Sequence, residues 1–353
     1  MSMRTVSALI AASLVTSPSW TPAQGPGELA KAPPPTGLLP PEAATTIAAR
    51  VALLEGPAFD DKGGLFFSDV YGNRIYKMTP GGAVAVFRAD SGRTNGNTFD
   101  AKGRLISCEG AEQGPGGRRR IVRTDPETGK VEVLTERYDG KRYNGPNDVV
   151  ADAKGRVWFT DPFYGDDRSA LEMDAEAVYR IDPDGSVRRV LTQPEVERPN
   201  GLALTPDGKT LYVVDSHGRP GGNRKVWAFD VAADGTPGRR RLVFDFGKGR
   251  GGDGLRLDGR GNLWVAAGIM FPRHAGETAD VPPGVYVLAP EGKLLGRIPI
   301  PEDLCTNLAF GGPGRKTLFV TAGKSIYMVP LAVSGYALYP PSEPEKPGAG
   351  PGR

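Results

Sequence analysis

The 353-residue sequence predicts an all-β protein, a six-bladed β-propeller with four antiparallel strands in each blade. Three observations predict this fold class. One hairpin-like motif recurs six times, strand-like segments follow every copy, and 49 Gly with 33 Pro supply turns along the chain. A Gly and Pro content this high is typical of disorder unless it falls at regular intervals, which it does here.

The repeated motif is a short alternating strand, a tight Asp/Gly turn and an aromatic-rich second strand. Successive copies start 40, 52, 53, 53 and 53 residues apart, a period typical of a repeat architecture. The copies read EGPAFDDKGGLFFSD, NGNTFDAKGRLISCE, NDVVADAKGRVWFTD, NGLALTPDGKTLYVVD, DGLRLDGRGNLWVAA and TNLAFGGPGRKTLFVTA. Their first residues are Glu55, Asn95, Asn147, Asn200, Asp253 and Thr306.

A third strand follows each hairpin, such as RIYKM at 74–78, and most copies add a fourth, such as AVAVF at 83–87. The sixth copy ends after its third strand, near Val329. We expect the segment 48–54 to complete the sixth blade and close the ring, because closure protects the strand edges. A solenoid of six β-units is the alternative, disfavoured because neither end has a polar capping repeat.

The two ends of the chain differ from the repeat. Residues 1–23 resemble a secretory signal peptide, so we expect export to the periplasm or secretion. A Pro-rich linker over 24–45, the propeller over 46–330 and a Pro/Gly-rich tail over 331–353 complete the predicted organisation. Cys108 and Cys305 fall in blades that are not adjacent, so we expect two buried free thiols.

Composition excludes several classes of partner and mechanism. With 44 Lys and Arg against 41 Asp and Glu, the net charge of +3 predicts no nucleic-acid surface. The apolar run near the N-terminus is too short to span a bilayer, so we expect no membrane span. Two His, with no G-x-S-x-G elbow and no H-E-x-x-H motif, argue against Ser-His-Asp and thermolysin-like hydrolases. The sequence leaves the oligomeric state open.

The first position of each motif should begin an innermost strand, so six side chains with oxygen atoms should converge on the central channel. Glu55 and Asp253 with Asn147 and Asn200 form a hard-oxygen set, which predicts one divalent cation, Ca²⁺ by preference. Mg²⁺, Mn²⁺ and Zn²⁺ are the alternatives, and zinc would prefer His or Cys. The structural alternative is that Asn-Gly and Asp-Gly pairs cap turns, which does not explain Glu55.

Other polar residues are candidates for binding a substrate. Asp or Glu ends the second strand of four blades, and we expect these acids to anchor turns, with Glu109 as the member that could contact substrate. The insertion 270–283, which carries His274, could form a lid or an ordinary exposed loop. The complete set of predicted substrate-binding residues is Asn95, Asn97, Asn147, Glu109 and His217.

The motifs EGPAF, YNGPNDVVADAKGRVWFTDP, RPNGLALTPDGKTLYVVDS, GDGLRLDGRGNLWV and GVYVLAPEGKLLG together resemble the senescence marker protein, gluconolactonase and regucalcin family over about 51–330. The resemblance implies a six-bladed propeller with one divalent cation, usually calcium, and hydrolysis of sugar lactones. It implies that Glu55 and Asn200 bind the metal and that Asp253 is both a ligand and the general base. Asn147 matches an asparagine near metal and substrate.

Two departures from the family pattern bear on the substrate. The regucalcin branch has an Arg two residues before the asparagine that Asn147 matches, and here that position is Gly145. The regucalcin branch also has a glutamate on the substrate side of the site, and this sequence has no matching glutamate near Gly165. The resemblance therefore implies no particular aldonolactone.

The predicted function is metal-dependent opening of a sugar lactone, in which the cation polarises the carbonyl group and Asp253 is the catalytic base. One alternative is an exported propeller that serves as a binding module with a structural metal. A second alternative is a paraoxonase-like or strictosidine-synthase-like esterase, disfavoured because paraoxonase chemistry would depend on channel histidines.

Overall fold

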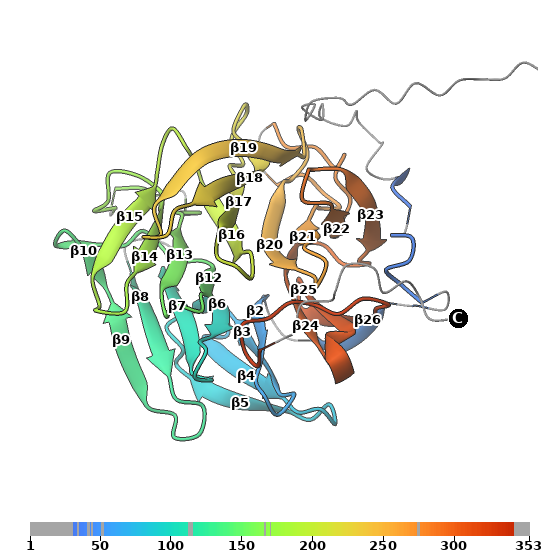
Figure 1. Ribbon diagram of the computed structural model, residues 1–353, viewed down its shortest axis with the longest axis horizontal. Coiled ribbons are helices and arrows are strands. Elements are labelled where there is room, and N and C mark those ends of the chain that lie inside the picture. The colour runs from blue at the N-terminus through green and yellow to red at the C-terminus, as the bar shows by residue number, and fades with distance from the viewer. Residues whose placement is uncertain are drawn as a thin grey trace, which may run out of the picture.

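The computed structural model describes residues 31–33, 35–40, 43, 45–50, 53–111, 116–165, 167–169, 171–273 and 276–341. Six four-stranded sheets stand around a central axis, as Figure 1 shows face-on, and the predicted β-propeller is confirmed. The predicted signal peptide and His274 lie outside the described residues. Among the residues that are described, no helix has the length and apolar character needed to cross a membrane.

In blades one to five the strands follow one another in chain order from the axis outward. Blade one contains β2 (Leu54–Phe59), β3 (Leu65–Asp69), β4 (Arg74–Met78) and β5 (Val84–Ala89). Blade two contains β6 (Thr94–Phe99), β7 (Leu105–Ala111), β8 (Gly117–Thr124) and β9 (Val131–Thr135), followed by a small hairpin of β10 (Arg137–Tyr138) and β11 (Lys141–Arg142). Blade three contains β12 (Val149–Ala151), β13 (Val157–Asp161), β14 (Ala177–Ile181) and β15 (Val187–Leu191).

The second half of the ring repeats this order. Blade four contains β16 (Pro199–Leu204), β17 (Thr210–Ser216), β18 (Arg224–Val231) and β19 (Pro237–Asp245). Blade five contains β20 (Gly252–Leu257), β21 (Leu263–Ala267), β22 (Gly284–Leu288) and β23 (Leu294–Pro299). Blade six contains β24 (Cys305–Gly311), β25 (Thr317–Ala322), β26 (Ser325–Pro330) and, as its outermost strand, β1 (Thr46–Arg50).

The ring is closed by strands from both ends of the propeller, as predicted. The closing strand is β1 at Thr46–Arg50 instead of the predicted 48–54, since Leu54 already begins β2. β1 pairs antiparallel with β26, with Thr46 opposite Met328 and Arg50 opposite Ser325. At the axis, the hydroxyl of Thr306 in β24 donates a hydrogen bond of 2.7 Å to the carbonyl of Leu54 in β2. Blade six is therefore built from strands of both ends of the propeller, and a hydrogen bond at the axis joins its inner strand to that of blade one.

Apolar side chains of the second strands hold neighbouring blades together. All five residues of β13 and all five of β21 are buried, because both faces of each sheet are covered by the adjacent blades. Trp158 packs with residues of blade four, and Trp264 packs on Phe310 of blade six with ring centroids 5.4 Å apart. The aromatic side chains of these strands thus pack between neighbouring blades.

Parts of both segments outside the predicted propeller pack against it. Leu331 and Val333 are buried, and the Ala332 amide donates a hydrogen bond of 2.7 Å to the carbonyl of Leu38. The Tyr336 amide donates a bond of 2.9 Å to the carbonyl of Leu257 at the end of β20. The described parts of the predicted linker and tail therefore pack on the ring instead of extending from it. The apolar residues after β26 explain this difference from the prediction, because they bury their side chains against the propeller.

Cys108 in blade two and Cys305 in blade six are both buried and free. They lie on the inner half of blades that are not adjacent, so no bridge joins them, as the sequence predicts.

Glycines next to the first motif residues allow the inner strands to approach one another. A Cβ atom on Gly201 would lie 2.2 Å from the carbonyl oxygen of Asp253, and one on Gly96 would lie 2.5 Å from that of Asn147. The Gly96 amide also donates a hydrogen bond of 2.7 Å to the Asn147 carbonyl. The Asn-Gly pairs thus belong to inner strands that touch across blades, so the turn-capping explanation does not apply to them.

We predict that Gly201→Ala lowers the free energy of unfolding by about 1–3 kcal/mol, because a Cβ would force blades four and five apart. The measurement is urea denaturation followed by circular dichroism. Gly81→Ala is the matched control, since its nearest neighbour would be Thr79 Oγ1 at 3.8 Å. Equal midpoints for the two variants would contradict the importance of this close approach.

Candidate active site

The six first-motif residues meet in one cavity of about 680 Å³ at one end of the central channel. In five blades the residue is the second of its inner strand, and the strand pairing shifts register directly beside it. Such bulges redirect a side chain away from the regular pleat. The cavity wall therefore contains all six residues that the motif alignment brings together, namely Glu55, Asn95, Asn147, Asn200, Asp253 and Thr306.

Two carboxylates of this wall are buried at the axis. Glu55 is 5% exposed and Asp253 is 4% exposed. Burial, together with the negative charges of Asp253 and Asp148, raises the pKa of Glu55 well above its usual range. Burial also raises the pKa of Asp253, although Arg250 opposes this effect. Two buried like charges that raise each other's pKa are unfavourable unless a cation compensates them.

Two amide oxygens of the wall lack a hydrogen-bond donor. Asn95 Oδ1 and Asn200 Oδ1 are both buried without a partner. Asn200 Nδ2 donates a bond of 2.7 Å to the hydroxyl of Tyr164, so the amide presents its oxygen as the free end. An orphaned buried acceptor costs about 1–3 kcal/mol, which a bound cation would remove. Carboxylate and amide oxygens are the donors that a hard divalent cation prefers.

The donor set does not resemble a zinc site. Among the described residues there is no group of three or more His, Cys, Asp or Glu side chains that could hold a metal ion. The candidate ligands are instead two acids and neutral amides. The residues present thus fit calcium or another hard cation.

Arg250 is a cavity residue that the sequence analysis missed. It forms an ion pair with Asp253 Oδ2, and its Nη1 donates a bond of 3.2 Å to the carbonyl of Cys305. Arg250 therefore holds the Oδ2 atom of Asp253 in place. It does not contact the other carboxylate oxygen, Oδ1.

Tyr164 is a second missed residue of the cavity wall. It follows β13, and its ring lies beneath the guanidinium of Arg198 at 5.4 Å. Arg198 in turn donates hydrogen bonds of 2.8 and 3.1 Å to the carboxylate of Glu176. This chain of contacts holds the phenol beside Asn200, where burial raises its pKa.

A spacing signal marks Arg250 as a candidate, although it does not fix the direction of the side chain, and no such signal marks Tyr164. An Arg stands two or three residues before the first motif residue in three blades, at Arg93, Arg198 and Arg250. Arg93 and Arg250 both line the cavity.

Acids that end the second strands anchor the loops that enter the site. Asp161 accepts hydrogen bonds from the amides of Asn144 at 2.9 Å and Gly145 at 2.7 Å, and so holds the loop that leads to Asn147. Asp215 accepts a bond of 2.8 Å from the Arg198 amide, two residues before the fourth blade's ligand candidate. These acids act as scaffold, as expected.

Asn97, a predicted substrate-binding residue, is not exposed to this cavity. Its Nδ2 donates bonds of 2.9 Å to the Gly56 carbonyl and 2.8 Å to Ser68 Oγ. Its Oδ1 accepts a bond of 2.7 Å from Ser107 Oγ. The side chain is fully buried and its polar atoms are occupied within the protein.

Glu109 is likewise absent from the cavity wall. It is fully buried and forms ion pairs with Arg88 and, at 2.6 Å, with Arg120. These arginines lie on the outer strands of blades one and two. Glu109 therefore joins two blades by charge instead of facing the channel.

His217 is the third predicted substrate-binding residue that does not line the cavity. It lies in the loop after β17. Its Nδ1 accepts a hydrogen bond of 3.2 Å from the Arg219 amide. Burial and the positive charges of Arg198 and Arg219 lower its pKa to about 4. The imidazole is therefore neutral at pH 7.

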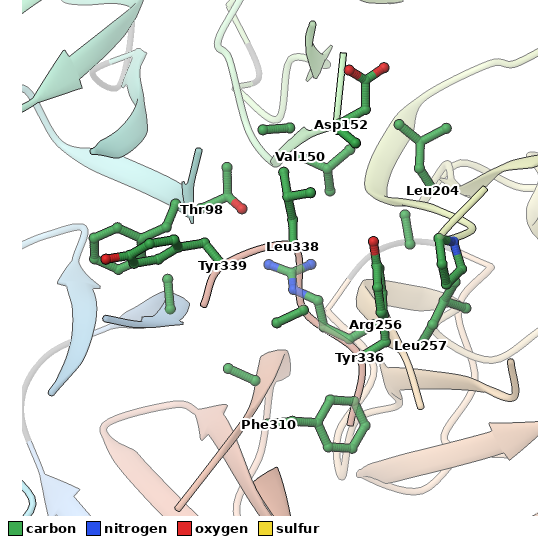
Figure 2. A pocket seen from close by; sticks show the side chains of 18 of the residues that line it. Thr98, Val150, Asp152, Leu204, Arg256, Leu257, Phe310, Tyr336, Leu338 and Tyr339 are labelled. Atoms are coloured by element: carbon green, nitrogen blue, oxygen red, sulfur yellow. The ribbon is translucent and has the colours of Figure 1, made fainter. Parts of the chain in front are cut away.

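A buried ion pair lies between this cavity and the other end of the channel. Asp148 Oδ2 is 3.2 Å from Nη1 of Arg256, and Asp148 is 1% exposed. Figure 2 shows Arg256 within a second cavity, of about 180 Å³, alongside Tyr336 and Leu338 of the C-terminal segment. The negative charge of Asp148 raises the pKa of both Glu55 and Asp253, so this ion pair is electrostatically coupled to the site.

A family model described as the SMP-30/Gluconolactonase/LRE-like region matches residues 53–324. The chain is 34% identical over 307 residues to a gluconolactonase of Zymomonas mobilis, with 80% of both chains covered. It is 27% identical over 272 residues to the pentonolactonase XacC of Haloferax volcanii, covering 76% of this chain and 80% of that protein. A solved gluconolactonase structure from Xanthomonas campestris superposes with a TM-score of 0.69 at 34% identity, covering 82% of this chain and 90% of that chain.

We predict that His217 makes the fold less stable as the pH falls from 7 to 5. The unfolded imidazole takes up a proton near pH 6.5, whereas the folded one does so only near pH 4. The unfolded state therefore binds more protons in this window, at a cost of about 1 kcal/mol after solvent screening. Urea midpoints at pH 7 and 5 should fall less for His217→Gln than for the wild type, and equal losses would contradict the assignment.

Proposed function

The chain belongs to the SMP-30/gluconolactonase/LRE-like family, and from this premise we propose that it is a hydrolase that opens a sugar lactone and depends on one divalent cation, with calcium preferred. One observation carries the proposal: two buried carboxylates and two amide oxygens without donors meet in a sugar-sized cavity. The similarity to gluconolactonases supports the reaction class.

Glu55, Asn200 and Asp253 would hold the cation, with Asn95 or Asn147 beside them. Their oxygens would leave part of a calcium coordination sphere of about six to eight ligands to water or substrate. A bound divalent cation supplies a Lewis acid, which draws electron density from the carbonyl oxygen of the lactone. Mg²⁺ and Mn²⁺ would use the same oxygens in a tighter cage.

Asp253 would act as the general base. Arg250 holds its Oδ2, which keeps Oδ1 in a fixed position for the proton of an attacking water. Burial raises the pKa of this carboxylate, and a raised pKa makes it a stronger proton acceptor. After the water oxygen bonds to the carbonyl carbon, the bond from that carbon to the ring oxygen breaks. Asp253 then returns the proton to the departing alkoxide.

The amides of the rim would orient the sugar. Asn95, on β6, and Asn147, just before β12 of the adjacent blade, both line the cavity, and each carries an N–H donor for a substrate hydroxyl. The cavity of about 680 Å³ is large enough for a six-carbon lactone with its first waters.

We predict that calcium raises the Tm of the wild type by about 5 °C at saturation, because a ligand that binds only the folded state stabilises it. Glu55→Gln should reduce this shift strongly, since it removes one of two carboxylate charges. The measurement is differential scanning calorimetry of chelator-treated protein with and without calcium. Asp167→Asn, an exposed acid of the same cavity, is the control that should keep the shift. Equal shifts in both variants would refute the proposed ligand set.

We predict that Asp253→Asn lowers kcat for a lactone about a hundredfold or more at saturating calcium, because it removes the base while keeping an oxygen ligand. Initial rates are measured with a pH indicator, and calcium-dependent Tm values show whether the cation still binds. Asp167→Asn is again the control. Lactone turnover within a few-fold of wild type would instead favour a binding module with a structural metal.

A further inference from the structure

Three arginines occupy related places at the entrance to the site, and two of them are neutralised. Arg198 is paired with Glu176, and Arg250 is paired with Asp253. Arg93, two residues before Asn95, has no hydrogen-bond acceptor or acidic partner for its guanidinium among the described residues. Among the described residues, its guanidinium lies over the ring of Tyr71, 5.6 Å from the ring centroid.

The backbone of Arg93 is held in a conformation that Arg rarely adopts. Its φ is 52°, in the left-handed region that glycine and asparagine tolerate best. The Arg93 amide donates a hydrogen bond of 2.7 Å to Asn73 Oδ1, which fixes this conformation. Strain of this kind is retained where the position of a side chain matters. Here the strained residue, Arg93, lines the cavity together with Tyr71.

The charge of the wall indicates what Arg93 would bind. A divalent cation at Glu55 and Asp253 would balance both carboxylates. Asp167 is then the remaining acidic side chain among the lining residues, against Arg93 and Arg250. Counted over the described lining residues, the loaded cavity would thus carry a net positive charge, and Arg93 is the arginine there without an ion pair.

We propose that Arg93 and Tyr71 form a subsite for an anionic substituent of the lactone, a carboxylate or a phosphate carried on the sugar away from the ring carbonyl. This inference rests on the proposed lactonase function and narrows its substrate class. The guanidinium pairs with the anion in a bidentate manner, and the exposed ring of Tyr71 supports the guanidinium from one side.

The test compares charged and neutral lactones of the same ring size on the calcium-loaded full chain. One pair is 6-phosphoglucono-δ-lactone and glucono-δ-lactone, and the other is glucaro-γ-lactone and glucono-γ-lactone. The two pairs separate phosphate from carboxylate recognition. The variants are Arg93→Asn, which suits a left-handed backbone, and Arg93→Lys, which keeps the charge. Arg188→Gln, whose side chain is 67% exposed on β15, is the matched control.

We expect the wild type to show a kcat/KM about tenfold or more higher for at least one charged lactone than for its neutral partner. Arg93→Asn should lower kcat/KM for that charged lactone about tenfold to a hundredfold, mainly through KM, and leave the neutral partner within about threefold. Arg93→Lys should restore part of the loss. High salt should reduce the preference of the wild type, because it screens an exposed charge.

Two results would overturn the inference while the lactonase function stands. One is a wild type that hydrolyses neutral lactones as well as both charged ones. The other is an Arg93→Asn variant that loses both members of a pair equally, which would make Arg93 a structural residue. A wild type that hydrolyses no lactone would instead refute the proposed function, and this inference with it.

Discussion

The close approach of the inner strands at the axis is the constraint on which the site depends. Glycines such as Gly96 and Gly201 let each inner strand contact a backbone carbonyl of the next blade. The side chains beside these glycines then point into the space that remains, the channel. This packing requires the ring to be closed, through the pairing of β1 with β26. The site is therefore a property of the whole ring, since its two carboxylates belong to blades one and five.

The same packing buries several negative charges near the axis, which is electrostatically unfavourable unless positive charges compensate them. Glu55 and Asp253 are both buried, and the buried carboxylate of Asp148 adds a third negative charge that acts on them. Arg250 compensates the charge of Asp253, and Arg256 compensates that of Asp148. Losing one member of such a group costs more stability than the intact group supplies, because it leaves a buried charge unpaired. An apolar axis would give a more stable propeller, so carboxylates at this place indicate a functional requirement.

The fold could be predicted because every blade repeats the same hairpin at a nearly fixed spacing. The repeat also predicted that Glu55 and Asp253, which are 198 positions apart, share one cavity. It could not predict Asn97, because an asparagine inside a strand can face the axis or bond to neighbouring strands. Arg250 and Tyr164 were missed because they lie in loops, where spacing does not fix the direction of a side chain. Leu331 and Val333 were assigned to a tail because they follow the last repeat.

The insertion of blade five shows how one loop replaces a missing anchor. Blade five ends its second strand in Ala267, so no acid there holds the residues before β20. Instead Thr278 of the insertion donates a hydrogen bond of 3.1 Å to the Lys248 carbonyl, and its backbone pairs with Gly249. The Met270 amide donates a bond of 2.8 Å to Asp303, before β24. The described part of the insertion thus braces the entrances to two inner strands, including the residues that carry Arg250. This is the role that acids such as Asp161 perform in other blades, so the insertion supports the site whether or not it also covers it.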